Sequence, residues 1–261
     1  MILTVLLAAS LATVSIFGGF VPGTYERDAA SMAAQGTGQD LVDLFLVVPL
    51  LLGSFFLFLK GSRTAALIYG GTLLYILYSF IIYCFGVHFN RLFLLYCATL
   101  GLSLYAFILF MTRIRREKPE EWFADAPARW VSGYLFLVAV IFYLLWLSAL
   151  VPAIIRDTVP RDVAEYDLLV NPVHVIDIAF ALPGLILGAV LLWKGKGTGY
   201  LIASIALVFL VLLTIALAGM VVMLFIRDIS EDFTVALVFA ALTLATIVFT
   251  VLFFRKIKPA V

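Results

Sequence analysis

The stretch Gly199–Ile226, GYLIASIALVFLVLLTIALAGMVVMLFI, contains no charged side chain over 28 residues. An α-helix rises about 1.5 Å per residue, so about 20 apolar residues cross the hydrocarbon core of a bilayer. Apolar residues lie on every side of such a helix, whereas a helix at a membrane surface carries them on one face. The stretch therefore predicts a transmembrane helix.

Seven further stretches share this character, and the segments between them contain the charged residues, Pro and Gly that are typical of turns. Hydrophobic residues make up 65% of the chain and charged residues only 13%, which excludes an ordinary water-soluble surface. We predict an all-α integral membrane protein with eight transmembrane helices in a lipid bilayer. The predicted spans are 2–22, 41–59, 65–87, 92–112, 130–152, 173–193, 199–226 and 233–254.

The first span is about as long as a whole secretory signal peptide, including the regions that flank the apolar core of such a peptide. It has no Lys or Arg before its apolar run, and that run is longer than a typical signal core. We expect Met1–Phe20 to be a retained helix.

Several classes of protein are excluded by what the chain lacks. A net charge of +1 and the absence of a basic run argue against nucleic-acid binding. The sequence has no Gly-x-Ser-x-Gly elbow, His-Glu-x-x-His motif, Walker loop or dinucleotide fingerprint. Cys84 and Cys97 are too few for a disulfide framework. They flank a short turn, so a disulfide between them is geometrically conceivable, although free thiols are favoured.

Basic residues are concentrated on one side of the predicted membrane. Eight spans place both termini on the same side, and that side carries twelve of the seventeen Lys and Arg residues. Because basic residues favour the cytoplasmic side, we expect cytoplasmic termini. The other side is rich in acidic residues, namely Glu26, Asp28, Asp40, Asp157, Asp162, Glu165, Asp167, Asp228, Glu231 and Asp232.

The two halves of the chain carry the same polar pattern. A shift of 134 residues superimposes a D-x5-P motif and a following K-G-x-x-T motif on their second copies. The matching pairs are Asp43 and Asp177, Pro49 and Pro183, Lys60 and Lys194, Gly61 and Gly195, and Thr64 and Thr198. We predict two parallel four-helix repeats, 1–112 and 130–261, joined by a cytoplasmic linker, 113–129. The interface of such repeats is a common substrate path in transporters.

Two carboxylates lie inside predicted spans, where an ionisable group is costly and marks a functional candidate. Asp43 and Asp177 each have a polar residue three positions earlier, Asp40 and His174, which lies on the same helix face. The candidate binding set for an outward cavity is Gln39, Asp40, Asp43, His88, Asn90, Arg91, His174 and Asp177.

Three interpretations of these carboxylates remain open. They could cap the first turns of their helices, where an acid favours the positive end of the helix dipole. They could line a cavity that exchanges protons or binds a cationic solute. They could also form a metal site, in which His88, His174 and Asp177 converge with Asp40. As a mutational expectation, Asp177→Asn should reduce transport or binding far more than Asp28→Asn, because Asp28 is assigned to a loop.

Tyrosines are frequent in two neighbouring spans. Tyrosine favours membrane interfaces and interhelical hydrogen bonds, so packing is the default account of such residues, and a quinone or aromatic-ligand pocket is the alternative. The tyrosines are Tyr69, Tyr75, Tyr78, Tyr83, Tyr96 and Tyr105.

Three segments, Gly38–Val42, Phe85–Tyr96 and Asn171–Asp177, resemble a group of prokaryotic multi-spanning membrane proteins with no established activity. The resemblance implies a prokaryotic plasma (inner) membrane. It also draws attention to Gln39 and Asp177, together with Asp40 and Asn90.

The leading functional hypothesis is transport of a small solute, an ion or protons through a polar cavity between the repeats. A membrane-embedded enzyme or a metal- or quinone-binding protein is the first alternative. The second alternative is a partner or sensor subunit that recognises another membrane protein or a second copy of itself. No particular cofactor is indicated by the pattern.

Overall fold

The computed structural model describes residues 1–123, 125–230 and 234–258, and it is all-α. Eight helices within these residues are long and apolar enough to cross a membrane. The predicted class, a multi-pass helical membrane protein, is confirmed. Glu231 and Asp232, which the sequence assigns to the acidic side, lie outside the described residues.

The helices follow one another with short connections. The first half contains α1 (Ile2–Phe20), α2 (Ala30–Val42), α3 (Val48–Leu59), α4 (Arg63–Gly86) and α5 (Phe93–Ile114). The second half contains α6 (Ala128–Ile155), the short α7 (Arg161–Glu165), α8 (Pro172–Ile176), α9 (Leu182–Trp193), α10 (Gly197–Ile226) and α11 (Thr234–Phe254). A π-helical turn joins α2 to α3 and another joins α8 to α9, so each pair forms one continuous span, Ala30–Leu59 and Pro172–Trp193.

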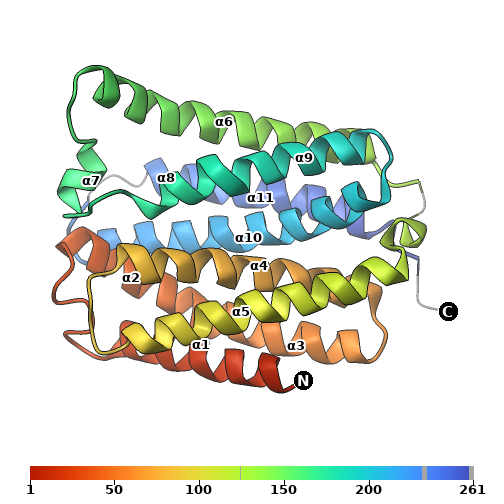
Figure 1. The fold of residues 1–261 in the computed structure, drawn as a ribbon, viewed down its shortest axis with the longest axis horizontal. Helices are drawn as coiled ribbons and strands as arrows, with labels where there is room; N and C mark the ends of the chain where they lie inside the picture. Colours follow the sequence, from red (N-terminus) through yellow and green to blue (C-terminus); the bar gives the residue numbers. More distant parts are fainter. Residues whose placement is uncertain (124, 231–233, 259–261) are drawn as a thin grey trace.

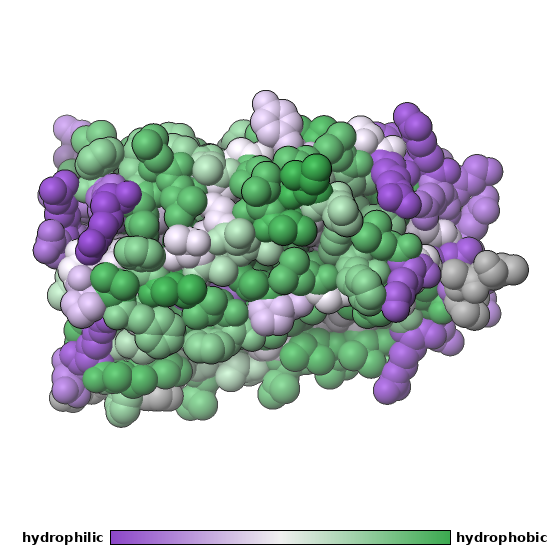
Figure 2. All heavy atoms as spheres, turned by 90° about the horizontal axis from the view of Figure 1, so that it is seen from below, coloured by the Kyte–Doolittle hydropathy of each residue, from purple (hydrophilic) through white to green (hydrophobic). Residues whose placement is uncertain are grey.

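The spans lie lengthwise in a single bundle (Figure 1). On the face shown in Figure 2, hydrophobic side chains cover the middle of the bundle, and hydrophilic side chains gather at its two ends. We call the end with the loops 21–29, 87–92, 156–171 and 227–230 the acidic end, and the end with the turns 60–62 and 194–196 the basic end. This banding is the surface that a bilayer-spanning bundle requires.

The second span begins eleven residues before its predicted start, at Ala30 rather than at residue 41. The added segment, ASMAAQGTGQD, is too polar to be recognised as a span by its hydropathy. Small residues pack it closely against neighbouring helices, and Thr37, Gly38, Gln39 and Asp40 are buried. Residues predicted near a helix end therefore lie well inside the bundle.

Helices α4 and α10 are the most buried of the eight spans and bring the two halves together. Helix α10 also packs against α2, and Gly38 lies against Gly219 where they meet. A methyl group on Gly38 would lie 2.5 Å from the backbone oxygen of Gly219. Glycine is required at this crossing because the two backbones touch, as small residues permit in membrane bundles.

Candidate functional site

Asp43 and Asp177 occupy the same kind of local structure. Each is the first residue of a five-residue π-helical turn, Asp43–Val47 and Asp177–Ala181, and each is followed six residues later by a proline, Pro49 or Pro183. A proline lacks the N–H that an α-helix needs and its ring crowds the preceding turn, so a wider turn relieves the conflict. Single π-helical turns inside α-helices are frequent at functional sites.

The capping interpretation of these two carboxylates is wrong. Asp43 comes thirteen residues after the start of its span at Ala30, and Asp177 lies beyond the first turn of α8. The cap of α8 is Asn171, whose side chain accepts a hydrogen bond from the N–H of Val173. The helix dipole acts only within the first turn, so neither carboxylate can act as a cap.

Asp40 is fully buried in α2 and is held by two phenols. Its Oδ2 accepts a hydrogen bond from the Tyr25 hydroxyl at 2.5 Å, and its Oδ1 accepts one from the Tyr83 hydroxyl at 3.0 Å. A methyl group on Gly18 would lie 1.7 Å from Asp40 Oδ2, so α1 leaves room for the carboxylate only with glycine at this position. Tyr25 lies in the loop between α1 and α2, where burial and then the Asp40 carboxylate raise the pKa of its hydroxyl well above the ordinary value. Tyr25 therefore stays a donor at neutral pH.

Asp43 lies one turn beyond Asp40 and is also buried. Its Oδ1 accepts a hydrogen bond from the Tyr75 hydroxyl at 2.8 Å. Its Oδ2 has no hydrogen-bond partner among the residues that the structure describes, and the Gln39 side chain lies near the carboxylate. A buried polar atom without a partner costs about 1–3 kcal/mol. Within the described residues, no Lys, Arg or His side chain forms an ion pair with Asp40 or Asp43. In this part of the chain, neither carboxylate has a counter-charge for its ionised form.

Asp177 is buried in the second half and has a partner for each oxygen. The Tyr78 hydroxyl donates to Oδ1 at 2.9 Å, and the Trp146 indole donates to Oδ2 at 2.8 Å. His174 lies one turn earlier, and its Nε2 is 3.4 Å from Asp162 Oδ2. The expected His and Asp pair therefore shares a helix face but binds different partners.

Helix α4 supplies a hydroxyl to each of the three carboxylates. Tyr83 binds Asp40, Tyr75 binds Asp43, and Tyr78 reaches across to Asp177 in the other half. The sequence analysis expected packing and interhelical hydrogen bonds from these tyrosines but did not predict their carboxylate partners, and it missed Tyr25 and Trp146 altogether. Tyr75, Tyr78 and Tyr83 have i, i+3 and i+8 spacing in one helix. This spacing is a sequence signal for the site, because it places three hydroxyls along a single helix in the interior of an otherwise apolar bundle.

Removal of the Tyr78 hydroxyl is expected to weaken the contact between the halves. Tyr78→Phe leaves Asp177 Oδ1 without its donor, so we expect the free energy of unfolding to fall by about 1–2 kcal/mol. Denaturation in mixed micelles measures this change. Tyr105→Phe is the matched control, because Tyr105 is 63% exposed and lies on the surface of α5. Equal stability of the two variants would contradict the role assigned to Tyr78.

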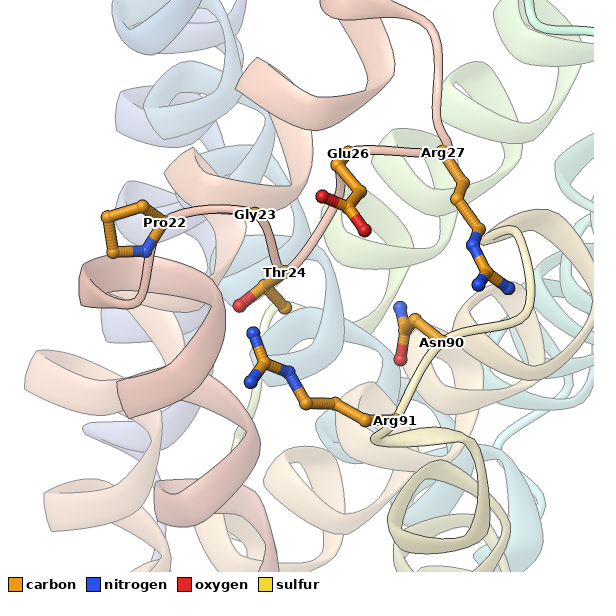
Figure 3. Close-up of a pocket in the computed structure, with 7 residues that line it drawn as sticks. All are labelled: Pro22, Gly23, Thr24, Glu26, Arg27, Asn90 and Arg91. Carbon is orange, nitrogen blue, oxygen red and sulfur yellow. The ribbon is translucent and has the colours of Figure 1, made fainter.

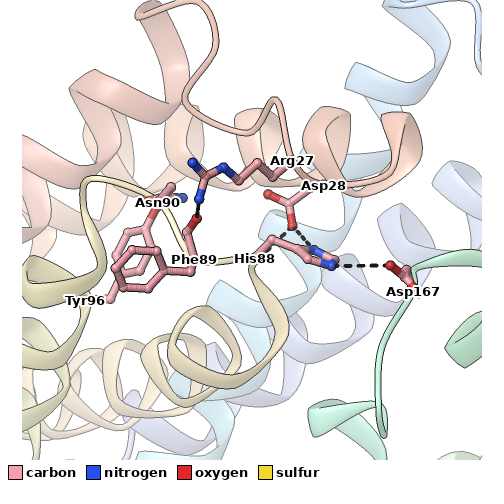
Figure 4. Close-up of polar contacts among 7 residues, drawn as sticks. All are labelled: Arg27, Asp28, His88, Phe89, Asn90, Tyr96 and Asp167. Atoms are coloured by element: carbon pink, nitrogen blue, oxygen red, sulfur yellow. Dashed lines mark hydrogen bonds and ion pairs between the residues drawn. The ribbon is translucent and has the colours of Figure 1, made fainter.

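His88, Asn90 and Arg91 lie in the loop between α4 and α5 at the acidic end. Figure 4 shows His88 and Asn90, and Figure 3 shows Arg91. The backbone N–H and the Nδ1 of His88 lie 2.9 Å and 3.0 Å from Asp28 Oδ1, and its Nε2 lies 3.9 Å from Asp167 Oδ2. Asn90 donates to the Tyr96 hydroxyl at 3.1 Å. The Asp28 side chain is only 3% exposed, so Asp28 is a structural partner of His88. Asp28→Asn is therefore a poor control for Asp177→Asn.

The proposed metal ligands are not brought together. His88 lies beside Asp28, whereas His174 lies beside Asp162 and Asp177 binds Tyr78 and Trp146. No group of three His, Cys, Asp or Glu side chains arranged to hold a metal occurs in the described part of the chain. Cys84 and Cys97 are both free thiols.

Two neighbouring hollows open at the acidic end. The first has a volume of about 360 Å³ and is shown in Figure 3, and the second has a volume of about 400 Å³. The first is lined by Pro22, Gly23, Thr24, Glu26, Arg27, Asn90 and Arg91. The second shares Pro22, Gly23, Thr24 and Glu26 and is also lined by Gly18, Gly19, Phe20, Val21, Tyr25, Ala33, Thr37 and Arg227. The second hollow therefore reaches Gly18 and Tyr25, two of the residues that touch Asp40.

The candidate residues thus occupy three places. Gln39, Asp40 and Asp43 are buried in the first half, and His174 and Asp177 are buried in the second. Asn90 and Arg91 line a hollow at the acidic end, and His88 lies beside them in the same loop. Neither hollow is lined by Asp43 or Asp177.

These features define a class, a multi-pass all-α membrane protein with carboxylates buried inside its bundle. In comparisons with known proteins, no family model, curated protein or solved structure matches the chain. The resemblance to prokaryotic multi-spanning proteins therefore stays a prediction and identifies no family.

Proposed function

We propose that this protein conducts protons or small cations across its membrane, and that Asp40 and Asp43 are the groups that bind them. The observation that carries the proposal is the Oδ2 of Asp43, which is unpartnered among the described residues and lies beside a second buried carboxylate. A carboxylate in an apolar interior without a cationic neighbour is neutralised by a proton or a bound cation. Buried carboxylates in membrane bundles commonly mark ion paths and proton relays.

The second hollow supports an entry route from the acidic end. Gly18 and Tyr25 are among the residues that line it, and the Tyr25 hydroxyl is hydrogen-bonded to Asp40. Asp43 follows one helical turn deeper. An ion or proton that enters the hollow would meet Tyr25, Asp40 and Asp43 in that order.

The π-helical turns at Asp43 and Asp177 support the proposal that the two halves are copies of one four-helix unit. In each half, an aspartate begins the turn and accepts a hydrogen bond from a tyrosine of α4, Tyr75 or Tyr78. If the halves are parallel copies, Asp177 is the second-half counterpart of Asp43. We assign Asp177 a secondary role, because both of its oxygens already have donors.

We further propose a cytoplasmic basic end, in keeping with its excess of Lys and Arg. Ser62 and Asp157 lie in connections at opposite ends of the bundle. In a background without Cys84 and Cys97, the single-cysteine variants Ser62→Cys and Asp157→Cys can be treated with a membrane-impermeant thiol reagent on intact cells. We expect Asp157→Cys to be labelled and Ser62→Cys to be protected. The reverse pattern would place the acidic end in the cytoplasm.

Proton and cation movement can be measured with the purified protein in lipid vesicles. A pH-sensitive dye inside the vesicles reports proton flux under an imposed membrane potential, and K⁺ or Na⁺ gradients test the cations. We expect the wild-type protein to dissipate at least one of these gradients faster than protein-free vesicles do. Identical rates with and without protein, for protons and both cations, would overturn the proposal.

A further inference from the structure

The first hollow stands out by its charge. The sequence assigns ten Asp and Glu residues but only five arginines to the acidic side, and three of the five, Arg27, Arg91 and Arg227, line the two hollows. Among the described residues, Glu26 is the one acidic residue in either lining, and it belongs to both. A positive depression at an otherwise acidic end is the arrangement that a ligand with an anionic group requires.

The charged groups in the first hollow do not neutralise one another. Within the described residues, neither Glu26 nor Arg91 forms an ion pair, and Arg91 lies over the ring of Phe17 at 5.9 Å from its centroid. Arg27 donates to the backbone oxygen of Phe89 at 2.8 Å, which fixes its direction. Figure 3 shows Glu26 on one wall and the guanidinium groups of Arg27 and Arg91 around the same space.

The turn that carries Glu26 holds it in place. Gly23 has a φ of 77°, and a methyl group at Gly23 would lie 3.3 Å from Glu26 Oε2, so the carboxylate folds back over the turn. Thr24 anchors the turn, because its hydroxyl donates to the backbone oxygens of Phe17 and Val21 at 2.9 Å and 2.8 Å. The hollow therefore presents one negative and two positive groups from a fixed backbone.

We infer that this hollow binds a zwitterionic group that joins a phosphate or carboxylate to a nearby primary ammonium, with Arg27 and Arg91 on the anion and Glu26 on the ammonium. Guanidinium groups bind phosphate and carboxylate oxygens through charge-assisted hydrogen bonds, and a carboxylate accepts them from an ammonium. Two sources supply this chemistry, the headgroup of phosphatidylethanolamine in the surrounding bilayer and a soluble compound such as phosphoethanolamine. The inference is independent of the proposed flux through Asp40 and Asp43.

Lipid binding tests the first source. Purified protein is equilibrated in mixed micelles with equal amounts of phosphatidylethanolamine and phosphatidylglycerol, which has the phosphate but no ammonium, and retained lipid is counted by native mass spectrometry. The second source is tested by titration of delipidated protein with phosphoethanolamine and with glycerol phosphate. Preferential retention of phosphatidylethanolamine supports a lipid ligand, and saturable, preferential binding of phosphoethanolamine supports a solute. No preference for the zwitterion in either experiment would overturn the inference.

Three variants test the assigned contacts. Arg91→Gln and Arg27→Gln should each weaken binding about tenfold, the loss expected for one charge-assisted contact. Glu26→Gln should instead remove the preference for the zwitterion while leaving binding of the phosphate. Arg156→Gln is the control, because Arg156 is an exposed arginine at the same end that lines neither hollow. All four residues are exposed, so folding should be unaffected. The assignment would be contradicted if Glu26→Gln kept the preference for the zwitterion. Equal binding by Arg91→Gln and Arg156→Gln would also contradict it.

Discussion

Asp43→Asn is expected to reduce proton or cation flux to the level of protein-free vesicles. The substitution keeps the shape of the side chain and its contact with the Tyr75 hydroxyl, but it removes the group that takes up a proton or cation. Because Asp43 has an unpartnered oxygen and no counter-charge among the described residues, its replacement by a neutral amide should not destabilise the fold. We therefore expect loss of flux with thermal stability equal to or above that of the wild type.

The control for this experiment is Asp228→Asn. Asp228 is exposed at the acidic end and has a φ of 54°, a left-handed conformation that asparagine also tolerates. The proton or cation flux of the Asp228→Asn variant should equal that of the wild type. Asp40→Asn provides a second test at the neighbouring carboxylate, where we expect a similar loss. Wild-type flux in folded Asp43→Asn and Asp40→Asn proteins would exclude the buried carboxylates as the carrier groups.

Gly38→Ala is expected to have the largest effect on stability. The new methyl group would meet the backbone of α10, 2.5 Å from Gly219 O and 2.8 Å from Met220 Cα, and a backbone cannot move aside as a side chain does. Overpacking of this kind costs about 1–3 kcal/mol. Because α2 and α10 belong to different halves, we also expect the variant to separate them and to impair flux. Thermal unfolding in detergent, followed by size-exclusion chromatography, measures the change.

Gly53→Ala is the matched control in the same span. A methyl group at Gly53 has no neighbour within 4 Å among the described residues, and alanine favours a helix over glycine by about 1 kcal/mol. We expect this variant to be as stable as the wild type or more stable. A similar melting temperature for the two alanine variants would show that the α2–α10 crossing tolerates a side chain.

Part of the candidate site could be predicted from the sequence. Asp43 and Asp177 are recognisable because a charged residue in an apolar span is locally anomalous, and the shared proline spacing marks the two positions as related. Their hydrogen-bond donors were not predictable, because Tyr75 is 32 residues from Asp43 and Tyr78 is 99 residues from Asp177. Such pairing depends on which helices pack together, and the spacing within one segment does not report it.

The sequence by itself determined the eight membrane spans, because the cost of exposing polar groups to hydrocarbon is a sum over each segment and needs no knowledge of its neighbours. Only the tertiary structure decided that the polar segment from Ala30 extends the second span, that α4 carries the donors for three carboxylates, and that Asp43 keeps one oxygen unpartnered among the described residues. It likewise decided which arginines surround a hollow. These features arise from contacts between distant segments, whose free energies depend on distances and burial that exist only once the bundle is packed.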